Sequence, residues 1–536
     1  MLKLESDFFM ANKTFYITTP IYYTSGNLHI GHAYTTIICD TIARYKKMLG
    51  YDVYFLTGTD EHGEKVQKKA EQEGQTPQQF VDNLVIGIKE LWKKLDINYD
   101  KFIRTTDDYH EESVSKIFSY LLKKGDIYKG EYKGWYCTPC EAFWTESQLK
   151  EGHLCPDCGR PVHEAKEEAY FFKMSKYAKK LVQYYDSNPE FIEPESRKNE
   201  MINTFIKPGL EDLCVSRTSF DWGIKVKEDP KHVIYVWIDA LSNYITALGY
   251  NTSDTKLFDK FWHNDENHEI LHVVGKEIMR FHVIYWPIIL LALGLPLPTK
   301  IFGHGWIVMK GGKMSKSVGN VIYPDTIINR YGLDALRYFV TSCIPFGQDG
   351  LFTPEIFIDN FNNDLVNNYG NLLSRTVAMV EKYFAGKVPC YKGQIVEYDK
   401  QLEEDMIEAK KLYEGKMDKF YVNEAIREVF NLLSKGNKYI DNTEPWALAK
   451  DESKKEELAS VLNHLILVLK EATLMLSCFL VETSYKALEQ LGITNDSYNN
   501  VLDFNSVDNV KVCKKDNLFP RLDPKIEIEY LNSKMK

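Results

Sequence analysis

Residues 22–32 read Tyr-Tyr-Thr-Ser-Gly-Asn-Leu-His-Ile-Gly-His, and this stretch decides the fold. A β-rich run precedes it at residues 14–19, and a helical pattern follows it at residues 33–49. His29 and His32 therefore fall at a strand–loop–helix junction, where side chains three residues apart can face one point. Because the unpaired amides and the dipole at a helix N-terminus attract anions, this junction predicts a site for nucleotide phosphates.

Gly31 lies between the two histidines, where a side chain would hold a flat ligand away from the backbone. The alternative is that the histidines only cap the helix. A second motif lies far along the chain, where residues 311–320 read Gly-Gly-Lys-Met-Ser-Lys-Ser-Val-Gly-Asn. Its lysines, Lys313 and Lys316, suit a mobile clamp for a polyphosphate, although such a charge run is more often only solvated.

Length and composition limit the number of domains and the classes of function that are possible. The 536 residues suggest three or four domains, and the net charge of −10 disfavours non-specific binding to duplex nucleic acid. We see no apolar run of transmembrane length, since the run at residues 288–297 is short and ends at prolines. Residues 1–12 lack the apolar core of a secretory signal. Ten cysteines in a chain of this kind indicate reduced thiols and a cytoplasmic location.

Four of those cysteines form two CxxC pairs, Cys137/Cys140 and Cys155/Cys158, with 14 residues between the pairs. Each pair presents two thiolates to one ion, so the spacing predicts one tetrahedral zinc per chain. Disulfides are the alternative. Four protein ligands leave no open position, which indicates a structural rather than a catalytic zinc.

The order of the patterns predicts an α/β fold with a parallel, Rossmann-type sheet interrupted by an insert. A strand at residues 51–57 ends in Gly-Thr-Asp-Glu-His-Gly, so Asp60 should lie at the ligand-binding edge of the sheet, although an aspartate there could also cap a helix. Further strands are expected at 233–237, 268–274 and 300–304, with a helix opening at 239. Helical periodicity at 357–384, 399–414, 421–437 and 455–491 predicts a C-terminal α-bundle.

The two motifs together resemble the signature of class I aminoacyl-tRNA synthetases, and the whole chain most resembles methionyl-tRNA synthetases of the bacterial or organellar type. The stretches that carry this resemblance are 18–23, 58–63, 235–240, 371–375 and 442–446. It implies a first catalytic half at 1–124, a zinc-bearing connective insert at 125–232, a second catalytic half at 233–330, a stem-contact linker at 331–370 and an anticodon-binding bundle at 371–536.

The resemblance also implies a reaction. Methionine and ATP form methionyl-adenylate, with Mg²⁺ accompanying ATP, and the 3′-terminal adenosine of tRNA(Met) then takes the methionyl group. The catalytic residues carried over from the family are His29, His32, Lys313 and Lys316. The residues implied to contact ATP are His29, Gly31, His32, Gly275, Glu277, Ile307 and Lys316.

The methionine pocket implied by the resemblance consists of Ile21, Tyr23, Asp60, Trp237, Tyr244 and His282. Asp60 would pair with the ammonium, and the aromatic rings would surround the thioether, although ordinary core packing is the usual fate of such rings. Anticodon bases would be read by Asn371, Arg375 and Trp446. A Pro-Trp pair at a helix start is also a common packing device.

Two other functions remain open on the sequence: another class I amino-acid specificity, and a paralogue that binds tRNA without catalysis. The insert has no room for the editing domain of the valyl, leucyl and isoleucyl enzymes after its zinc segment. The closed zinc site differs from one that would read a substrate thiol in a cysteinyl enzyme. Some family members carry a C-terminal tRNA-binding dimerisation domain, which we do not find after residues 518–522, so we expect a monomer. Because we see no apolar run of transmembrane length, we expect no membrane association.

Overall fold

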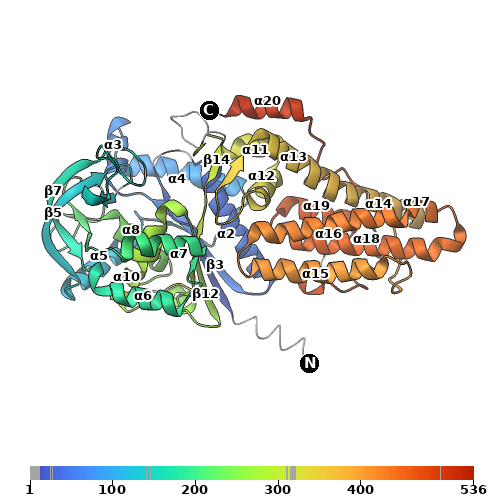
Figure 1. Ribbon diagram of the computed structural model, residues 1–536, viewed down its shortest axis with the longest axis horizontal. Helices are drawn as coiled ribbons and strands as arrows, with labels where there is room; N and C mark the ends of the chain where they lie inside the picture. The colour runs from blue at the N-terminus through green and yellow to red at the C-terminus, as the bar shows by residue number, and fades with distance from the viewer. Residues whose placement is uncertain are drawn as a thin grey trace. The chain divides into compact units, whose positions relative to one another are not determined.

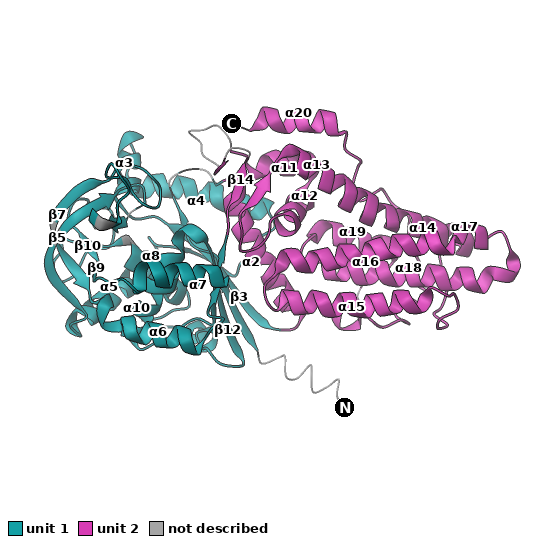
Figure 2. Ribbon diagram, viewed as in Figure 1, with its two compact units in different colours: residues 1–28, 51–304 teal, residues 29–50, 305–536 magenta. Residues whose placement is uncertain are grey.

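The computed structural model describes residues 13–24, 26, 28–140, 142–144, 146–309, 312–313, 321–494 and 497–535. The chain forms two compact units (Figure 2). Residues 1–28 and 51–304 make the first unit, and residues 29–50 and 305–536 make the second. The helix that follows the His29–His32 motif therefore packs within the second unit, although strands of the first unit flank it in sequence.

The first unit is built on a parallel sheet with the strand order β2-β3-β1-β12-β13-β8, and β4 pairs with β3. Figure 1 labels β3 and β12 of this sheet. Its strands are β1 (Thr14–Thr18), β2 (Tyr22–Tyr23), β3 (Asp52–Asp60), β4 (Lys101–Arg104), β8 (Ile192–Glu193), β12 (His268–Gly275) and β13 (Lys300–His304). The predicted parallel sheet is confirmed. The second predicted strand is longer than expected, because β3 continues to Asp60.

Apolar side chains from strands and helices form the main core of this unit, and two smaller clusters are separate from it. Tyr16, Leu56 and Ile103 of three neighbouring strands pack with residues of the helices that connect them. Those helices include α5 (Asp108–Lys123), α8 (Val236–Thr246) and α10 (Trp286–Leu293), whereas α3 (Glu64–Gln72) and α4 (Pro77–Lys94) contribute Val66, Ala70, Phe80 and Val81 to a smaller cluster. The strands read as nearly continuous apolar runs because helices cover a parallel sheet on both faces.

One sequence prediction in this unit is wrong. Residues 233–237 were expected to resume the parallel sheet, but β11 (Val233–Ile234) is short and pairs antiparallel with β10 (Ser216–Arg217). Helix α8 begins directly afterwards, so Trp237 lies in a helix. The β-branched residues favour a strand locally, but burial of the helix face that carries Ile238 and Leu241 overrides that propensity.

The connective segment forms an antiparallel sheet with the order β6-β5-β7-β9. Its strands are β5 (Ile127–Cys137), β6 (Ala142–Trp144), β7 (His163–Phe172) and β9 (Leu213–Cys214). It also holds α6 (Ala178–Ser187) and α7 (Glu195–Met201). Strand β8, which lies in the same segment of sequence, joins the edge of the parallel sheet by pairing with β13.

The second unit combines helix α2 (Ile30–Met48) with a small sheet and a helical bundle. The sheet has the order β15-β14-β16, made of β14 (Ile307–Met309), β15 (Gly312–Lys313) and β16 (Gly350–Phe352). The helices are α11 (Pro324–Tyr331), α12 (Leu333–Tyr338), α13 (Pro354–Asn360), α14 (Asn371–Phe384), α15 (Asp399–Met417), α16 (Val422–Thr443), α17 (Pro445–Leu448), α18 (Lys455–Leu476), α19 (Val481–Leu491) and α20 (Pro524–Lys534). The predicted C-terminal bundle is confirmed.

A buried ion pair fixes helix α2 inside the second unit. Arg337 is fully buried, and its Nη2 lies 2.7 Å from Oδ2 of Asp40 on α2. The same guanidinium donates to the carbonyl of Phe479 at 2.8 Å. Arg44 donates to Asp40 at 2.7 Å as well. The helix that carries His32 is thus tied to α12 and to the turn between α18 and α19.

In the part of the chain that the structure describes, one helix is long and apolar enough to cross a membrane by length and composition. It spans Glu452–Leu476, and 94% of its apolar window is buried inside the structure. This run differs from the sequence prediction, which expected no apolar run of transmembrane length. Such burial is typical of a core helix of a globular protein, and core helices can also have the length and composition of a membrane span.

Candidate active site and zinc centre

The two histidines of the first motif form the cap of helix α2. Nδ1 of His29 accepts the backbone N–H of Gly31 at 3.0 Å, and Nδ1 of His32 accepts the backbone N–H of His29 at 3.1 Å. The two rings are 4.1 Å apart at their centroids. Both interpretations from the sequence therefore concern one arrangement, in which the histidines cap the helix and stand together at its N-terminus.

This cap decides which ring nitrogen carries the proton. Because Nδ1 is the acceptor in both rings, the proton of a neutral imidazole lies on Nε2. Two N–H donors are thus fixed by backbone contacts at the positive end of a 19-residue helix. Such an arrangement can hold the oxygens of a phosphate group.

The remaining residues predicted to contact ATP are divided between the units. Gly275 ends β12 in the first unit, and a Cβ there would lie 2.5 Å from the carboxylate of Glu277. Ile307 begins β14 in the second unit and is buried. Lys313 ends β15, which pairs with β14. Lys316 and the side chain of Lys313 lie outside the described residues.

Asp60 stands at the carboxyl end of β3, opposite Tyr23 in the register of β2 with β3. Its carbonyl accepts the backbone N–H and the hydroxyl of Thr24, both at 3.1 Å. The helix-capping alternative for Asp60 is wrong, because α3 begins at Glu64 with Gly63 as its N-cap. Asp60 instead closes a strand at the edge where open α/β sheets bind ligands.

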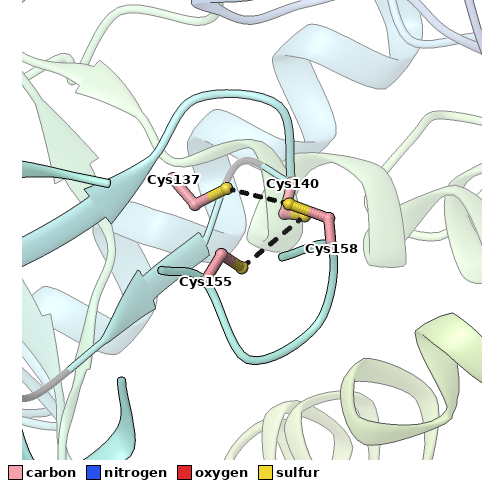
Figure 3. Close-up of side chains that lie close together, drawn as sticks. All are labelled: Cys137, Cys140, Cys155 and Cys158. Carbon is pink, nitrogen blue, oxygen red and sulfur yellow. Dashed lines mark hydrogen bonds between the residues drawn. The ribbon is translucent and has the colours of Figure 1, made fainter. Parts of the chain in front are cut away.

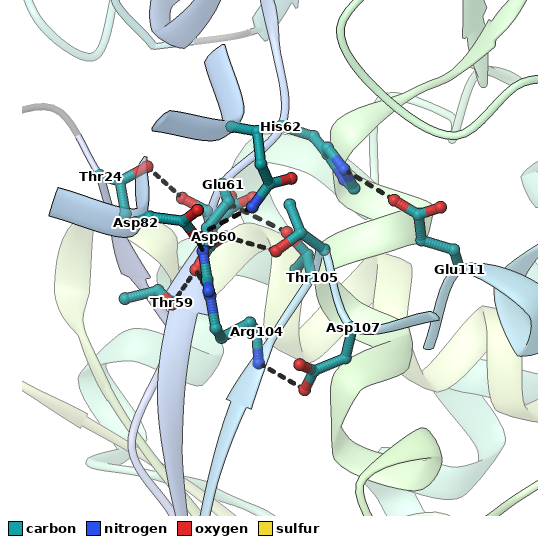
Figure 4. A network of polar contacts seen from close by, with 12 residues as sticks. Thr24, Thr59, Asp60, Glu61, His62, Asp82, Arg104, Thr105, Asp107 and Glu111 are labelled. Atoms are coloured by element: carbon teal, nitrogen blue, oxygen red, sulfur yellow. Dashed lines mark hydrogen bonds and ion pairs between the residues drawn. The ribbon is translucent and has the colours of Figure 1, made fainter. Parts of the chain in front are cut away.

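The residue after Asp60 anchors this turn (Figure 4). Glu61 is fully buried, and its two oxygens each accept a bond of 2.8 Å from Arg104. Thr59 and Thr106 donate to the same carboxylate at 2.5 and 2.6 Å. A bidentate guanidinium contact of this kind holds both orientation and distance. The backbone that carries Asp60 is therefore fixed against β4 and the loop that follows it.

Aromatic side chains meet between α8 and the segment at Phe281–Tyr285. Trp237 stacks on Phe281 with centroids 3.5 Å apart and planes 9° apart. The hydroxyl of Tyr244 lies 2.7 Å from Nε2 of His282. Ile21 packs against the same core as these rings. Three of the predicted pocket residues, Trp237, Tyr244 and His282, therefore belong to one pair of neighbouring elements, and Phe281 joins them.

The polar members of this aromatic group are neutral. Burial lowers the pKa of His282 to about 4. Nδ1 of His282 faces the carbonyl of Ile278 at 2.9 Å, so it carries the ring proton, and Nε2 accepts the hydroxyl of Tyr244. Burial also lowers the pKa of His272, whose ring stacks on Tyr244. An uncharged, polarisable surface of this kind suits a thioether.

The four cysteines of the connective segment converge (Figure 3). Cys137 ends β5, and Cys140 follows in the next turn. The Sγ atoms of Cys137 and Cys158 are 3.6 Å apart, and those of Cys140 and Cys155 are 3.9 Å apart. All four thiols are free, so the disulfide alternative is wrong.

These separations fit a metal. Four sulfurs at about 2.3 Å from one zinc ion stand about 3.8 Å from each other in a regular tetrahedron. The observed separations of 3.6 and 3.9 Å lie on either side of that value. Hydrogen bonds with Cys137 and Cys155, together with burial, raise the pKa of the Cys140 thiol. A divalent cation would relieve that crowding by binding the thiolates.

The three residues predicted to read the anticodon lie in the helical bundle. Asn371 and Arg375 are one turn apart on α14, and Asn371 is exposed. Arg375 Nη2 lies 3.8 Å from Asp441 in the last turn of α16, directly before α17. Trp446 on α17 is 41% exposed. That exposure argues against the core-packing alternative for this tryptophan.

Several residues near the predicted methionine pocket were not singled out from the sequence. His62, His110 and Asp239 form a buried polar group between β3, α5 and α8. Phe281 forms the stack with Trp237. The motifs containing His62 and Asp239 were recognised, but 177 residues separate the two. Only the adjacency of both motifs to ligand-binding residues could have suggested that they meet.

Family models cover most of the chain. Residues 15–165 and 159–377 match the model described as tRNA synthetases class I (M). Residues 388–520 match the model described as anticodon binding domain of methionyl tRNA ligase.

Individual relatives agree with these models. The methionine–tRNA ligase of Clostridium tetani is 56% identical over 525 residues, which cover 98% of this chain and 81% of that protein. The corresponding ligase of Bacillus subtilis is 55% identical over 538 residues, covering 98% and 80%. Mycobacterium tuberculosis methionyl-tRNA synthetase in complex with methionyl-adenylate has a TM-score of 0.90 and 38% identity, covering 95% of this chain and all of that one. Its apo form has a TM-score of 0.84 and 35% identity, covering 96% and 99%.

Proposed function

This chain belongs to the methionyl-tRNA synthetases of class I, and from that premise we propose how its residues join methionine to tRNA. The chain activates methionine with ATP and esterifies the product to tRNA. The structural observation that carries the assignment of residues is the uncharged group of Trp237, Tyr244 and His282 in the unit that also holds Asp60. A carboxylate for an ammonium and polarisable rings for a thioether are what methionine requires.

In the first step, a carboxylate oxygen of methionine attacks the α-phosphorus of ATP, the bond from that phosphorus to the bridging oxygen breaks, and pyrophosphate leaves. No protein nucleophile is required, so the protein contributes position and charge stabilisation. Nε2–H of His29 and of His32 donate to phosphate oxygens, since their Nδ1 atoms are occupied by backbone amides. Lys313 and Lys316 neutralise charge that develops on the leaving pyrophosphate, with Gly31, Gly275, Glu277 and Ile307 positioning the nucleoside. Mg²⁺ bound to ATP would add a further positive charge at the phosphates.

The carboxylate of Asp60, at the end of β3, binds the ammonium group of methionine beside Ile21 and Tyr23. The Tyr244 hydroxyl hydrogen is directed to His282, so the tyrosine oxygen presents lone pairs rather than a proton to a neighbouring group. Such a pocket discriminates between methionine and an amino acid that differs by one methylene-sized group by roughly 1–3 kcal/mol of binding free energy. Homocysteine is therefore the expected near-cognate substrate.

In the second step, a hydroxyl of the tRNA's 3′-terminal adenosine attacks the carbonyl carbon of methionyl-adenylate, and AMP leaves. Asn371, Arg375 and Trp446 select the tRNA at its anticodon, where Trp446 stacks on a base. One zinc ion on Cys137, Cys140, Cys155 and Cys158 cross-links the connective segment, whose own apolar core is small. We place the enzyme in the cytoplasm, in keeping with its free thiols.

ATP–pyrophosphate exchange with each of the twenty amino acids tests this function. Exchange should depend on methionine, with homocysteine as the principal side reaction. A preference for another amino acid would support a different class I specificity. Absence of exchange with every amino acid, together with retained tRNA binding, would support a non-catalytic paralogue.

A further inference from the structure

The methionine-binding residues of the first unit fall into two groups on separate elements. Asp60 and Tyr23 stand on paired strands, β3 and β2. Trp237 and Tyr244 stand on α8, nearly two turns apart. Methionine has its ammonium at one end and its thioether at the other, so binding depends on the distance between these groups. Some contact must set that distance.

One buried contact joins the two groups. Nδ1 of His62 lies 2.7 Å from Oδ2 of Asp239, and the two side chains are 3% and 1% exposed as residues. His62 follows Asp60 by two residues, and Asp239 follows Trp237 by two residues. The contact therefore ties the turn that carries the ammonium partner to the first turn of the helix that carries the aromatic rings.

The contact is an ion pair. Burial alone lowers the pKa of His62, but the charge of Asp239 and the hydrogen bonds that His62 donates to Asp239 and Glu111 outweigh burial and raise that pKa to about 10. Burial likewise raises the pKa of Asp239, and the charge of His62 with the bonds from His110 and His62 reverses the effect and lowers it. Nε2 of the imidazolium faces Glu111 at 3.3 Å (Figure 4).

Asp239 is held from a third element as well. Its Oδ1 lies 2.8 Å from Nε2 of His110 on α5, and Nδ1 of His110 lies 2.7 Å from the hydroxyl of Thr246 at the end of α8. Both carboxylate oxygens are therefore engaged. Because these contacts fix Asp239 against α5 and α8, they also fix the position of the imidazole of His62.

We propose that His62 is a positioning residue for methionine: its contact with Asp239 sets the distance between Asp60 and the rings on α8. This inference rests on the proposed function of Asp60 as the ammonium partner. His62 does not touch the substrate in this role. It acts on methionine binding through the turn formed by residues 60–62, whose other anchor is the contact of Glu61 with Arg104.

The charged groups around His62 allow an experiment to distinguish a positioning role of His62 from a purely electrostatic role. Carboxylates outnumber cations, the carboxylates being Asp60, Glu61, Asp82, Glu111 and Asp239 and the cations Arg104 and His62. Replacing His62 with a neutral side chain makes the surroundings more negative, which by charge alone would strengthen binding of an ammonium. A weaker affinity for methionine would therefore report lost position rather than lost charge.

Two neutral replacements test the contact. In His62→Asn the amide nitrogen can stand where Nδ1 stood and donate to Asp239, whereas in His62→Gln the amide reaches toward Glu111 and leaves Asp239 with His110 alone. We expect His62→Gln to raise the KM for methionine tenfold or more in ATP–pyrophosphate exchange, with the KM for ATP within twofold of wild type. His62→Asn should stay within about threefold for both substrates. Equal effects of the two variants, or a lowered KM for methionine, would overturn the proposal.

A substrate analogue without the ammonium supplies a second readout. 4-(Methylthio)butanoate keeps the thioether and the carboxylate, so it bypasses Asp60. Its inhibition constant should be unchanged in His62→Gln while methionine binds more weakly. Parallel loss for both ligands would mean a general disturbance of the pocket and would refute the positioning role. Glu111→Gln is the matched control, because Glu111 faces the other nitrogen of His62 and its side chain is 41% exposed; methionine KM should remain within twofold.

Asp60→Asn distinguishes failure of this inference from failure of the proposed function. If Asp60→Asn leaves the KM for methionine unchanged, the assignment of Asp60 is wrong. If it raises that KM while His62→Gln and His62→Asn both match wild type, only the positioning role is wrong. Should His62→Gln not fold, Asp239→Asn tests the same contact from the other side, and the expected result is the same selective rise in the KM for methionine.

Discussion

Trp446→Ala separates recognition of tRNA from activation of methionine. Trp446 is 41% exposed on the short helix α17, whose neighbouring residues Pro445 and Leu448 are buried. Its exposed ring is available to stack on an unpaired base, and removing such a stack costs about 1–3 kcal/mol. Charging of tRNA, measured as kcat/KM, should therefore fall by roughly 5- to 150-fold.

The stability of the variant follows from the same exposure. A fully buried tryptophan replaced by alanine costs about 3–5 kcal/mol of unfolding free energy. With 41% of the residue already exposed, the expected loss is roughly 2–3 kcal/mol. The protein should remain folded with a lowered melting temperature. Because Trp446 on α17 is not among the residues proposed to bind methionine or ATP, exchange of ATP and pyrophosphate with methionine should proceed at the wild-type rate.

The assay is a pair of rates on one preparation, methionine activation and tRNA charging, with thermal unfolding alongside. Trp446→Phe keeps a stacking ring and should charge tRNA within about threefold of wild type. Tyr485→Ala is the matched control, since Tyr485 is an aromatic residue of the same unit with 73% exposure, and it should leave charging unchanged. Charging by Trp446→Ala within twofold of wild type, or equal loss of both rates, would refute anticodon stacking.

Three further predictions concern the catalytic loop, the metal and the bundle core. Lys316→Ala should lower the rate of adenylate formation by a hundredfold or more, on the order of 3 kcal/mol, with methionine affinity retained; a fall of less than about fivefold in single-turnover experiments would contradict the role. Metal analysis should find one zinc per chain on the four cysteines, and a chelator should lower the melting temperature; a purified, folded protein without metal would contradict this. Burial raises the pKa of Glu471 well above its usual value, so the folded protein binds a proton there that the unfolded chain releases above about pH 4.5. The free energy of unfolding therefore falls as the pH rises from about 4.5 toward the pKa of Glu471 in the folded protein. Glu471→Gln should raise the melting temperature at pH 7 but not at pH 4. A gain that does not vary with pH would show that the charge is irrelevant.

Local spacing carried the most reliable sequence predictions. Two CxxC pairs bring four thiols together through short turns, so predicting the four-cysteine cluster required little knowledge of the fold. The strands at residues 268–274 and 300–304 were also found, because buried parallel strands read as apolar runs. Trp237 was misplaced in a strand, since β-branched neighbours favour a strand locally while core contacts of Ile238 stabilise a helix.

Contacts between residues far apart in the chain could not be predicted from the sequence. His62 and Asp239 are 177 residues apart, and Arg337 and Asp40 are 297 residues apart. No periodicity reports such pairs, because burial of both partners depends on the completed fold. The roles of His29 and His32 show a different limit. Their spacing predicted either a helix cap or a phosphate site, and the structure shows the cap, with the proton of each neutral ring on Nε2, where the proposed phosphate contact requires it.

Helix α2 has a consequence for how the chain folds during synthesis. The ribosome releases Asp40 early, but Arg337 follows only 297 residues later, which takes roughly 15–60 s at typical rates of translation. The carbonyl of Phe479 arrives later still. During that interval, α2 lacks its buried contact with Arg337, so the nascent chain offers chaperones an incompletely packed amphipathic helix. A fragment that ends at residue 304 would contain the whole parallel sheet and yet leave this helix exposed, and it should aggregate unless α2 is removed with it.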